Sequence, residues 1–353
     1  ILLSSNDIEK LKEAEKLFKI LIQRGDAIVK NENGIGNIHK GKHELHIYGN
    51  ALSLYAGMLY YGIGVQTNKN EAIKLFKKSI ELNNQQGIFS YATILLENDD
   101  AQSKLKAAEY FKQIKDINSD AMFEYGMMLL TGNGIPINKQ EAVECIRKAV
   151  EHENPRAIFQ YGRMLLEGNE VPCNKELAIE YYKKAGDLGN NHAMFIYAMN
   201  LIQQNEKEGL MYLKKSADLG NPNAMAMYGM ILNRKNESPS IKKVAIEYLK
   251  KSSDLQCQLG MLNYADILSE NDDFECNRKA AELYKKIIDD GTDPRFNANA
   301  MLNYGYLLEL GKGVPKNLKE AAFYYKQSAN LGCPDAMACY GEMLYYGKGV
   351  KVD

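Results

Sequence analysis

The sequence predicts an all-α protein, built as a right-handed superhelical α-solenoid of about nine helical hairpin repeats. Three observations predict this fold. A tyrosine followed by glycine or alanine recurs at steps of 31 to 40 residues, apolar residues repeat around it with the period of a helix, and a second helical pattern follows each first one except the last. The nine tyrosines are Tyr55, Tyr91, Tyr125, Tyr161, Tyr197, Tyr228, Tyr264, Tyr304 and Tyr340.

The N-terminal residues depart from the repeat. Residues 1–24 predict a helix that completes a preceding repeat, because Ala14 and Phe18 match the pattern of the second helices. Segment 25–46 breaks the pattern and is expected to be a loop inserted between repeats. Residues 47–353 then form the repeat array, with nine first helices and a truncated last repeat. We expect the chain to be part of a longer polypeptide.

The first helix of each repeat is defined by its small and apolar positions. Four residues before the tyrosine every copy has alanine or glycine, and four residues after it every copy has leucine. Offsets of −4, −3, 0, +1, +3 and +4 lie on one face of an α-helix. The small residue at −4 is expected to let neighbouring hairpins approach closely.

The second helix carries a small residue followed about four residues later by an aromatic one, as in Ala72 with Phe76 and Ala321 with Tyr325. A loop with two glycines often joins the two helices. Its first glycine should end the first helix in a left-handed turn, and an asparagine should cap the second helix. The expected capping residues are Asn68, Asn138, Asn174 and Asn317.

The composition limits the possible partners. Hydrophobic residues make up 45% and charged residues 25% of the chain, which is typical of a folded protein. Lysine plus arginine (44) nearly balances aspartate plus glutamate (45), so no overall field attracts nucleic acid or an anionic membrane. No apolar run approaches the roughly 20 residues that cross a bilayer. We therefore expect protein or peptide partners, without nucleic acid and without membrane insertion by this segment.

The repeated motif resembles a known family. Its parts are tyrosine-glycine, leucine at +4, G-x-G-V-P-x-N, E-A with an aromatic-lysine-lysine run, and A-D-L-G-N; segment 178–197, AIEYYKKAGDLGNNHAMFIY, is a close example. Residues 47–353 resemble the Sel-1-like repeats, relatives of the tetratricopeptide repeats. The repeat at 197–227 departs by lacking the glycine loop, and Gly87 and Gly260 replace the usual alanine.

The resemblance implies a non-catalytic scaffold or adaptor within a multi-protein complex, as in endoplasmic-reticulum quality control, signalling and bacterial regulation. By the tetratricopeptide correspondence, partners would lie in a concave groove lined by the first helices. Four consecutive copies have phenylalanine at −2, with arginine, histidine and methionine at −5 and +2. These residues form the expected partner-binding set: Phe89, Phe123, Phe159, Phe195, Arg156, Arg163, His192, Met127 and Met199. The alternative is that the phenylalanines belong to the core.

Chemical motifs are weak. His39, His43 and His46 have a metal-compatible spacing, but no cysteine or carboxylate cluster joins them, so we expect no metal and no cofactor. Ser103 with Lys106 and Ser240 with Lys243 match S-x-x-K, and we expect these serines to be helix N-caps without catalysis. A hydrolase or β-lactam-binding protein is the distant alternative, and an architectural subunit using its convex face and ends is the nearer one.

The six cysteines lack the regular spacing of a zinc site or a disulfide framework. Cysteines without such a framework are typical of proteins in a reducing compartment. We therefore expect a cytoplasmic location, with the endoplasmic-reticulum lumen or another secretory compartment as the alternative.

Overall fold

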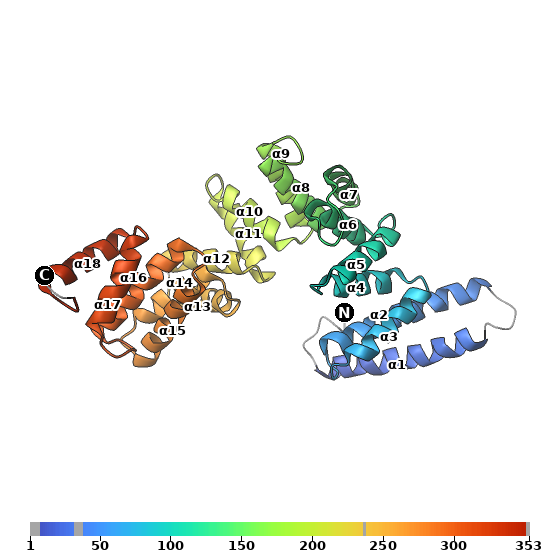
Figure 1. The fold of residues 1–353 in the computed structure, drawn as a ribbon, viewed down its shortest axis with the longest axis horizontal. Coiled ribbons are helices and arrows are strands. Elements are labelled where there is room, and N and C mark those ends of the chain that lie inside the picture. The colour runs from blue at the N-terminus through green and yellow to red at the C-terminus, as the bar shows by residue number, and fades with distance from the viewer. Residues whose placement is uncertain (1–7, 32–37, 236–237, 351–353) are drawn as a thin grey trace. The chain divides into compact units, whose positions relative to one another are not determined.

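The computed structural model of the protein describes residues 8–31, 38–235 and 238–350, with side chains described outside 30–42. These residues form helices and connections, and no strand is found among them (Figure 1). The helices are α1 (Ile8–Asn31), α2 (Ile38–Tyr61), α3 (Lys69–Glu81), α4 (Gln85–Leu96), α5 (Ala101–Ile114), α6 (Ser119–Thr131), α7 (Lys139–Glu151), α8 (Pro155–Glu167), α9 (Lys175–Asp187), α10 (Asn191–Leu201), α11 (Glu206–Asp218), α12 (Pro222–Lys235), α13 (Pro239–Asp254), α14 (Gln258–Ser269), α15 (Phe274–Asp290), α16 (Pro294–Leu310), α17 (Leu318–Asn330) and α18 (Pro334–Tyr346).

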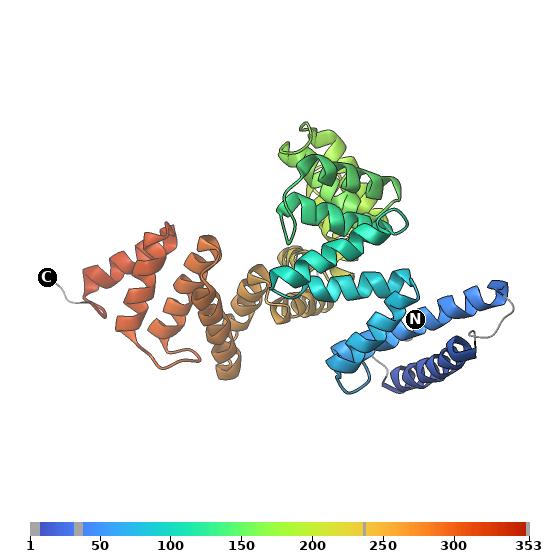
Figure 2. The ribbon, with the colours of Figure 1, turned by 45° about the vertical axis from the view of Figure 1, so that its right-hand side comes forward.

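The chain divides into two compact units, Ile1–Tyr181 and Tyr182–Asp353. Within each unit, helices that follow one another in the chain pack as antiparallel hairpins, for example α6 with α7 and α16 with α17 (Figure 2). The recurring tyrosines all lie in the even-numbered helices from α2 to α18, and the second patterns lie in the odd-numbered ones. The prediction of an all-helical array of hairpin repeats is confirmed.

The small residue at −4 is buried in every first helix. At Gly87 an added Cβ would lie 2.1 Å from the hydroxyl oxygen of Ser79, and at Gly260 it would lie 2.1 Å from that of Ser252. Each serine hydroxyl donates a hydrogen bond to the backbone of the preceding first helix, at 2.8 and 2.7 Å. A serine at this position also precedes an alanine at −4, as Ser216 does before Ala224, so the serines alone do not account for the two glycines.

The glycine loops have the predicted turn chemistry. Gly132 and Gly311 end their helices with φ of 74° and 75°. The second glycine of a loop lies against the start of the preceding second helix: a Cβ on Gly313 would lie 2.2 Å from the backbone nitrogen of Arg278. Side chains of the four predicted asparagines accept hydrogen bonds from the first turns of their helices, which confirms the caps Asn68, Asn138, Asn174 and Asn317.

The structure corrects the predicted loop at 25–46. Helix α1 continues to Asn31 and α2 already begins at Ile38, so most of this segment is helical. Gly25, which the sequence suggested as a loop residue, lies where a Cβ would meet the ring of Tyr48 at 2.2 Å. The hydroxyl of Tyr48 donates to Asp26, which also pairs with Lys78. The glycine thus permits close packing of two long helices, and residues 32–37 lie outside the described residues.

Candidate functional site: the exposed side of the first helices

The phenylalanines at −2 differ in burial. Phe123 is 6% exposed and belongs to the core of the N-terminal unit. Phe89 and Phe159 are half-buried, and the ring of Phe89 lies 5.6 Å from that of Phe111 in the second helix. Phe195 is also half-buried and packs in the core of the C-terminal unit. Phe123 of this column therefore belongs to the core, whereas the other three phenylalanines remain partly accessible.

Arginine side chains lie over the column in the N-terminal unit. The guanidinium carbon of Arg156 lies 4.8 Å from the ring centroid of Phe123, and its nitrogen pairs with Glu124. Arg163, one helical turn after Phe159, is exposed and pairs with Glu167 at 3.0 Å. A cation over an aromatic face is attracted by the ring quadrupole. Arg156 and Phe123 are thus brought together as the sequence suggested, although Phe123 is largely covered.

The other predicted residues divide between the two units. Met127 is half-buried against the core of the N-terminal unit. Met199 is half-buried and His192 is exposed, both in the C-terminal unit. A ring nitrogen of His192 lies 3.2 Å from the side-chain nitrogen of Asn221, which caps the next first helix. His192 therefore has a structural contact beside any role with a partner.

Position −5 has a structural role that the sequence reasoning missed. Asn154 caps α8 and also donates to Asp120, which is the −5 residue of α6, at 2.7 Å. Asn84 donates in the same way to Asn50, the −5 residue of α2, at 2.8 Å. A polar side chain at −5 of one first helix thus bonds to the cap of the next first helix. The signal was present in the sequence, because asparagine stands seven residues before the tyrosine in most copies.

The C-terminal unit has a polar site that the sequence reasoning also missed. Asp266 occupies the +2 position of α14, and its Oδ1 accepts hydrogen bonds from the hydroxyl of Tyr284 at 2.7 Å and from the amide of Asn303 at 2.8 Å. Burial raises the pKa of the Asp266 carboxyl, while these two hydrogen bonds oppose the rise. The pKa of Tyr284 is raised by burial and by the neighbouring carboxylate. An acidic residue in the +2 column was the available signal.

A pocket beside Asp266 is lined by α12, α13 and α14. It has a volume of about 230 Å³, and its walls combine apolar side chains with Asn263 and Asp266. Because Met230 and Asp266 hold the same +2 position in successive first helices, the pocket lies on the side of the array where the sequence predicts partner binding. It is therefore a second candidate site.

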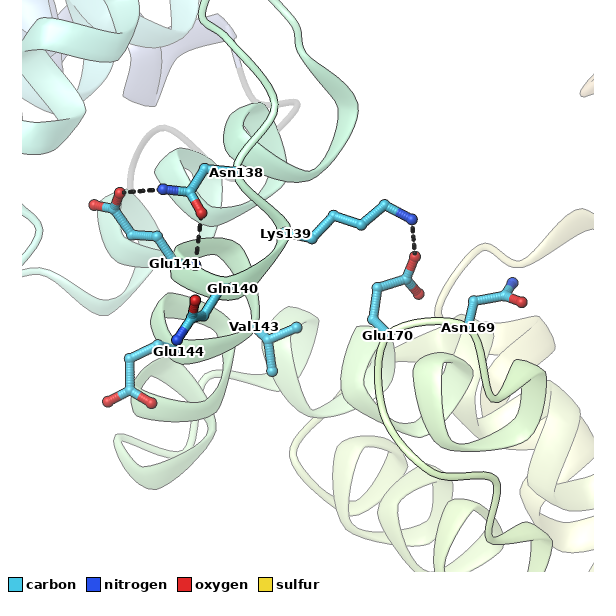
Figure 3. Close-up of a pocket in the computed structure, with 8 residues that line it drawn as sticks. All are labelled: Asn138, Lys139, Gln140, Glu141, Val143, Glu144, Asn169 and Glu170. Atoms are coloured by element: carbon cyan, nitrogen blue, oxygen red, sulfur yellow. Dashed lines mark hydrogen bonds and ion pairs between the residues drawn. The ribbon is translucent and has the colours of Figure 1, made fainter.

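A pocket of about 800 Å³ lies in the N-terminal unit between the start of α7 and the loop after α8 (Figure 3). In this loop Glu170 replaces the second glycine of the motif, which elsewhere lies against the preceding second helix. Lys139 pairs with Glu170 across the opening at 3.4 Å, as Figure 3 shows. Asn138 is engaged in capping α7. The opening thus coincides with the glycine replacement, and the two charged side chains across it already pair with each other.

The weak chemical motifs have structural explanations. Asp100 caps α5 and Ser238 caps α13, so the expectation that Ser103 and Ser240 are the caps is wrong by a few residues. The side chain of His39 lies outside the described residues, and His43 and His46 are exposed. Among the described residues no group of three metal-binding side chains is found, and no helix there is long and apolar enough to cross a membrane. All six cysteines are free thiols.

Comparisons with known proteins agree with the geometry. The Sel1 repeat pattern matches seven stretches that cover more than half of the chain: 49–84, 119–154, 155–190, 193–221, 222–257, 298–333 and 334–353. A comparison with curated protein sequences gave no match.

Two solved structures are similar in fold. One is c5321, a protective antigen of uropathogenic Escherichia coli strains with an SLR fold, at 20% identity and a TM-score of 0.51, covering 99% of this chain and 85% of that one. The other is a Sel1 repeat protein from Oxalobacter formigenes, at 21% identity and a TM-score of 0.53, covering 67% of this chain and 96% of that one.

Proposed function

The chain belongs to the Sel1 repeat family, and on this premise we propose that it is a non-catalytic scaffold that binds protein or peptide partners along the exposed side of its first helices. The observation that supports this proposal is that large side chains occupy the −2 and +2 positions of successive first helices in the N-terminal unit: Phe89, Met127, Phe159 and Arg163. Three of these side chains are half-buried and the fourth is exposed. Aromatic residues, methionine and arginine are enriched where proteins bind one another.

The proposed contact surface has a defined chemistry. Half-buried aromatic rings offer apolar area at a small entropic cost, because they are already held by the core. Arg156 and Arg163 are exposed beside them and each is paired with a glutamate of this chain. An amphipathic helix or an extended peptide with an apolar side and acidic flanks would complement this surface. Phe195, Met199 and His192 would offer a similar contact in the C-terminal unit.

The decisive experiment compares partners captured by the wild-type chain and by a Phe159→Ala, Arg163→Glu variant. Phe159 is preferred to Phe123, because truncating the buried Phe123 would cost about 3–5 kcal/mol of stability. Arg147→Glu, at an exposed arginine of a second helix, is the matched control for the charge change. Partners lost from the double variant but kept by the control would support the proposal. A partner list shared by all three proteins would place the interface elsewhere.

We place the protein in a reducing compartment, with the cytoplasm as the proposed location. The support is that six free thiols are present, of which Cys145 and Cys333 are buried. A titration with a thiol reagent on protein freshly isolated from its source tests this. Six reactive thiols after unfolding are expected, and fewer would indicate disulfides and an oxidising compartment.

A further inference from the structure

Asp266 in α14 is a carboxylate held in place with one oxygen left open. The hydrogen bonds from Tyr284 and Asn303 both go to Oδ1. The ring of Tyr284 is fully buried in α15, so its hydroxyl approaches the carboxylate from within the hairpin. Both neutral donors orient Asp266, but neither supplies the positive charge that a partly buried carboxylate favours.

The pocket beside Asp266 is lined more by polar than by apolar surface, and its apolar part is a small floor. Met230 and the buried side chains of Leu249 and Ile267 line it, together with Asn263 and Asp266. Its volume of about 230 Å³ lies below the roughly 300–1,000 Å³ of pockets for drug-sized ligands. The space therefore suits one long side chain better than a separate small molecule.

The rim of the pocket carries one charge of each sign. Glu270 lies one helical turn after Asp266, and Arg234 lies at the end of α12; both are exposed. With Asp266 ionised, the pocket has two negative groups and one positive group. This excess of negative charge favours binding of a cation, and Arg234 is the group of the pocket that repels it.

From this geometry we propose that the pocket binds a lysine side chain of a partner polypeptide. The aliphatic stem lies against Met230, Leu249 and Ile267, as the stems of lysine side chains do on apolar surfaces. The ammonium group donates to Oδ2 of Asp266 and to the side-chain oxygen of Asn263. A charge-assisted hydrogen bond to an ordered carboxylate is among the stronger polar contacts in a protein.

Lysine fits better than arginine because of how Asp266 is held. A guanidinium group pairs best with both carboxylate oxygens at once. Since Oδ1 already accepts two hydrogen bonds, only Oδ2 is open, and a single-point donor such as an ammonium group meets that geometry. The preference for lysine is therefore a consequence of Tyr284 and Asn303.

The test is a titration of the full chain, labelled at isoleucine and methionine methyl groups, with the peptide acetyl-Gly-Gly-Lys-Gly-Gly-amide. The methyl groups of Ile267 and Met230 report on the pocket directly. We expect a saturable shift of both signals with the lysine peptide, and at least about tenfold weaker binding when the ammonium is acetylated. Equal binding of the acetylated peptide, or no saturable shift at either methyl, would overturn the proposal.

Two variants assign the effect to residues. Asp266→Asn should weaken the lysine peptide by about tenfold, whereas Asp272→Asn, at an exposed carboxylate paired with Lys312, should change nothing. Arg234→Gln should strengthen binding by about twofold, because it removes the like charge at the rim. Weaker binding by Arg234→Gln would contradict the assignment. The acetylated peptide on the wild-type chain keeps the test valid even if Asp266→Asn folds poorly.

This inference rests on the proposed function only in taking the partner to be a polypeptide. The peptide titration measures binding to the C-terminal unit, and the comparison with the Phe159 variant measures partner binding by the N-terminal unit. If the peptide titration shows no lysine effect but partners still depend on Phe159, only the proposal for the pocket is refuted. If the lysine peptide binds but no partner depends on Phe159, the proposal for the pocket stands and the proposal for the aromatic surface is refuted.

Discussion

The two units of the chain use the same hairpin with different chemistry at equivalent positions. In the N-terminal unit the large residue of the second helix is Phe76 or Phe111, and the facing +2 positions include Gly57 and Thr93. In the C-terminal unit Tyr284 holds the equivalent place and bonds to a carboxylate at +2. A buried hydroxyl requires a partner. At Tyr284 the added oxygen of the second helix is thus accompanied by a polar group on the first-helix surface.

The exchange of phenylalanine for tyrosine in the second helix shows how a repeat protein can vary its surface without changing its backbone. Tyr325 in α17 also donates to a carboxylate, that of Glu309 at 2.9 Å, which lies at +5 of its first helix instead of +2. The array is held by small residues, glycine turns and caps common to both units. The outward columns are then free to differ, with Phe159 at −2 of α8 in one unit and Asp266 at +2 of α14 in the other.

The largest expected effect comes from exchanging the hydroxyl between the units. Tyr284→Phe removes a hydrogen bond to a charged group and should cost about 1.5–3 kcal/mol. Phe76→Tyr adds a buried hydroxyl and should cost about 1–3 kcal/mol of stability, because Gly57 has no side chain to accept its hydrogen bond. Adding Gly57→Asp should recover most of that loss, since a Cβ there meets no atom within 4 Å.

A double-mutant cycle measured by denaturant unfolding checks this exchange. Favourable coupling between Phe76→Tyr and Gly57→Asp would establish that the tyrosine–carboxylate pair is portable between units. Zero coupling would show that α14 and α15 hold Asp266 in a geometry that α2 and α3 lack.

Helix caps give the next effect. Asn154 accepts hydrogen bonds from the backbone N–H groups of Arg156 and Ala157, so Asn154→Ala should cost about 1–2 kcal/mol. Cys257 holds the equivalent position of α14 and makes no side-chain cap bond. Cys257→Asn should therefore stabilise α14 by about 0.5–1 kcal/mol.

Amide hydrogen exchange in the first turns of α8 and α14 measures both changes locally, which matters because repeat arrays open in parts. Slower exchange at α14 in Cys257→Asn is expected. Unchanged exchange there would mean that the thiol, which donates to Asn223 at 3.4 Å, already serves as well as asparagine.

The smallest expected effect is in the pH dependence of stability. Burial raises the pKa of Asp266 in the folded chain, so its contribution to stability is fully present below the ordinary aspartate pKa of about 3.9 and is lost as the pH rises through the folded pKa. Asp266→Asn cannot ionise. Relative to the wild type it should gain stability as the pH rises from about 4 toward neutrality, and urea unfolding across that range measures the difference. A constant difference at all pH values would contradict it.

The sequence predicted the hairpin repeats well because their signals are local and recur. The tyrosine, the alanine at −4 and the leucine at +4 lie within two helical turns, and glycine and asparagine act on the backbone beside them. Residues 85–118 and 258–297 fold as the same hairpins although the family pattern does not match them. There Gly87 and Gly260 depart from the usual alanine, and each lies against a serine of the preceding second helix.

The candidate sites could be predicted only in part. The phenylalanine column is a sequence feature, but the burial of Phe123 depends on how Arg156 of the next helix covers it. The −5 residues were expected to face partners, yet several bond to the neighbouring cap. Gly25 was interpreted as a loop residue, whereas the ring of Tyr48, 23 positions along the chain, gives that glycine a packing role inside α1.

The sequence by itself determined the class of fold, the number and phase of the repeats, the turns and the caps. These depend on periodicity and on backbone preferences within a few residues. The tertiary structure alone decided which columns are buried, that α1 and α2 are continuous through most of 25–46, and that Asp266 receives Tyr284 and Asn303 on one oxygen. Those outcomes depend on side chains 18 and 37 positions apart, which only packing within a hairpin and between neighbouring hairpins brings within hydrogen-bond distance.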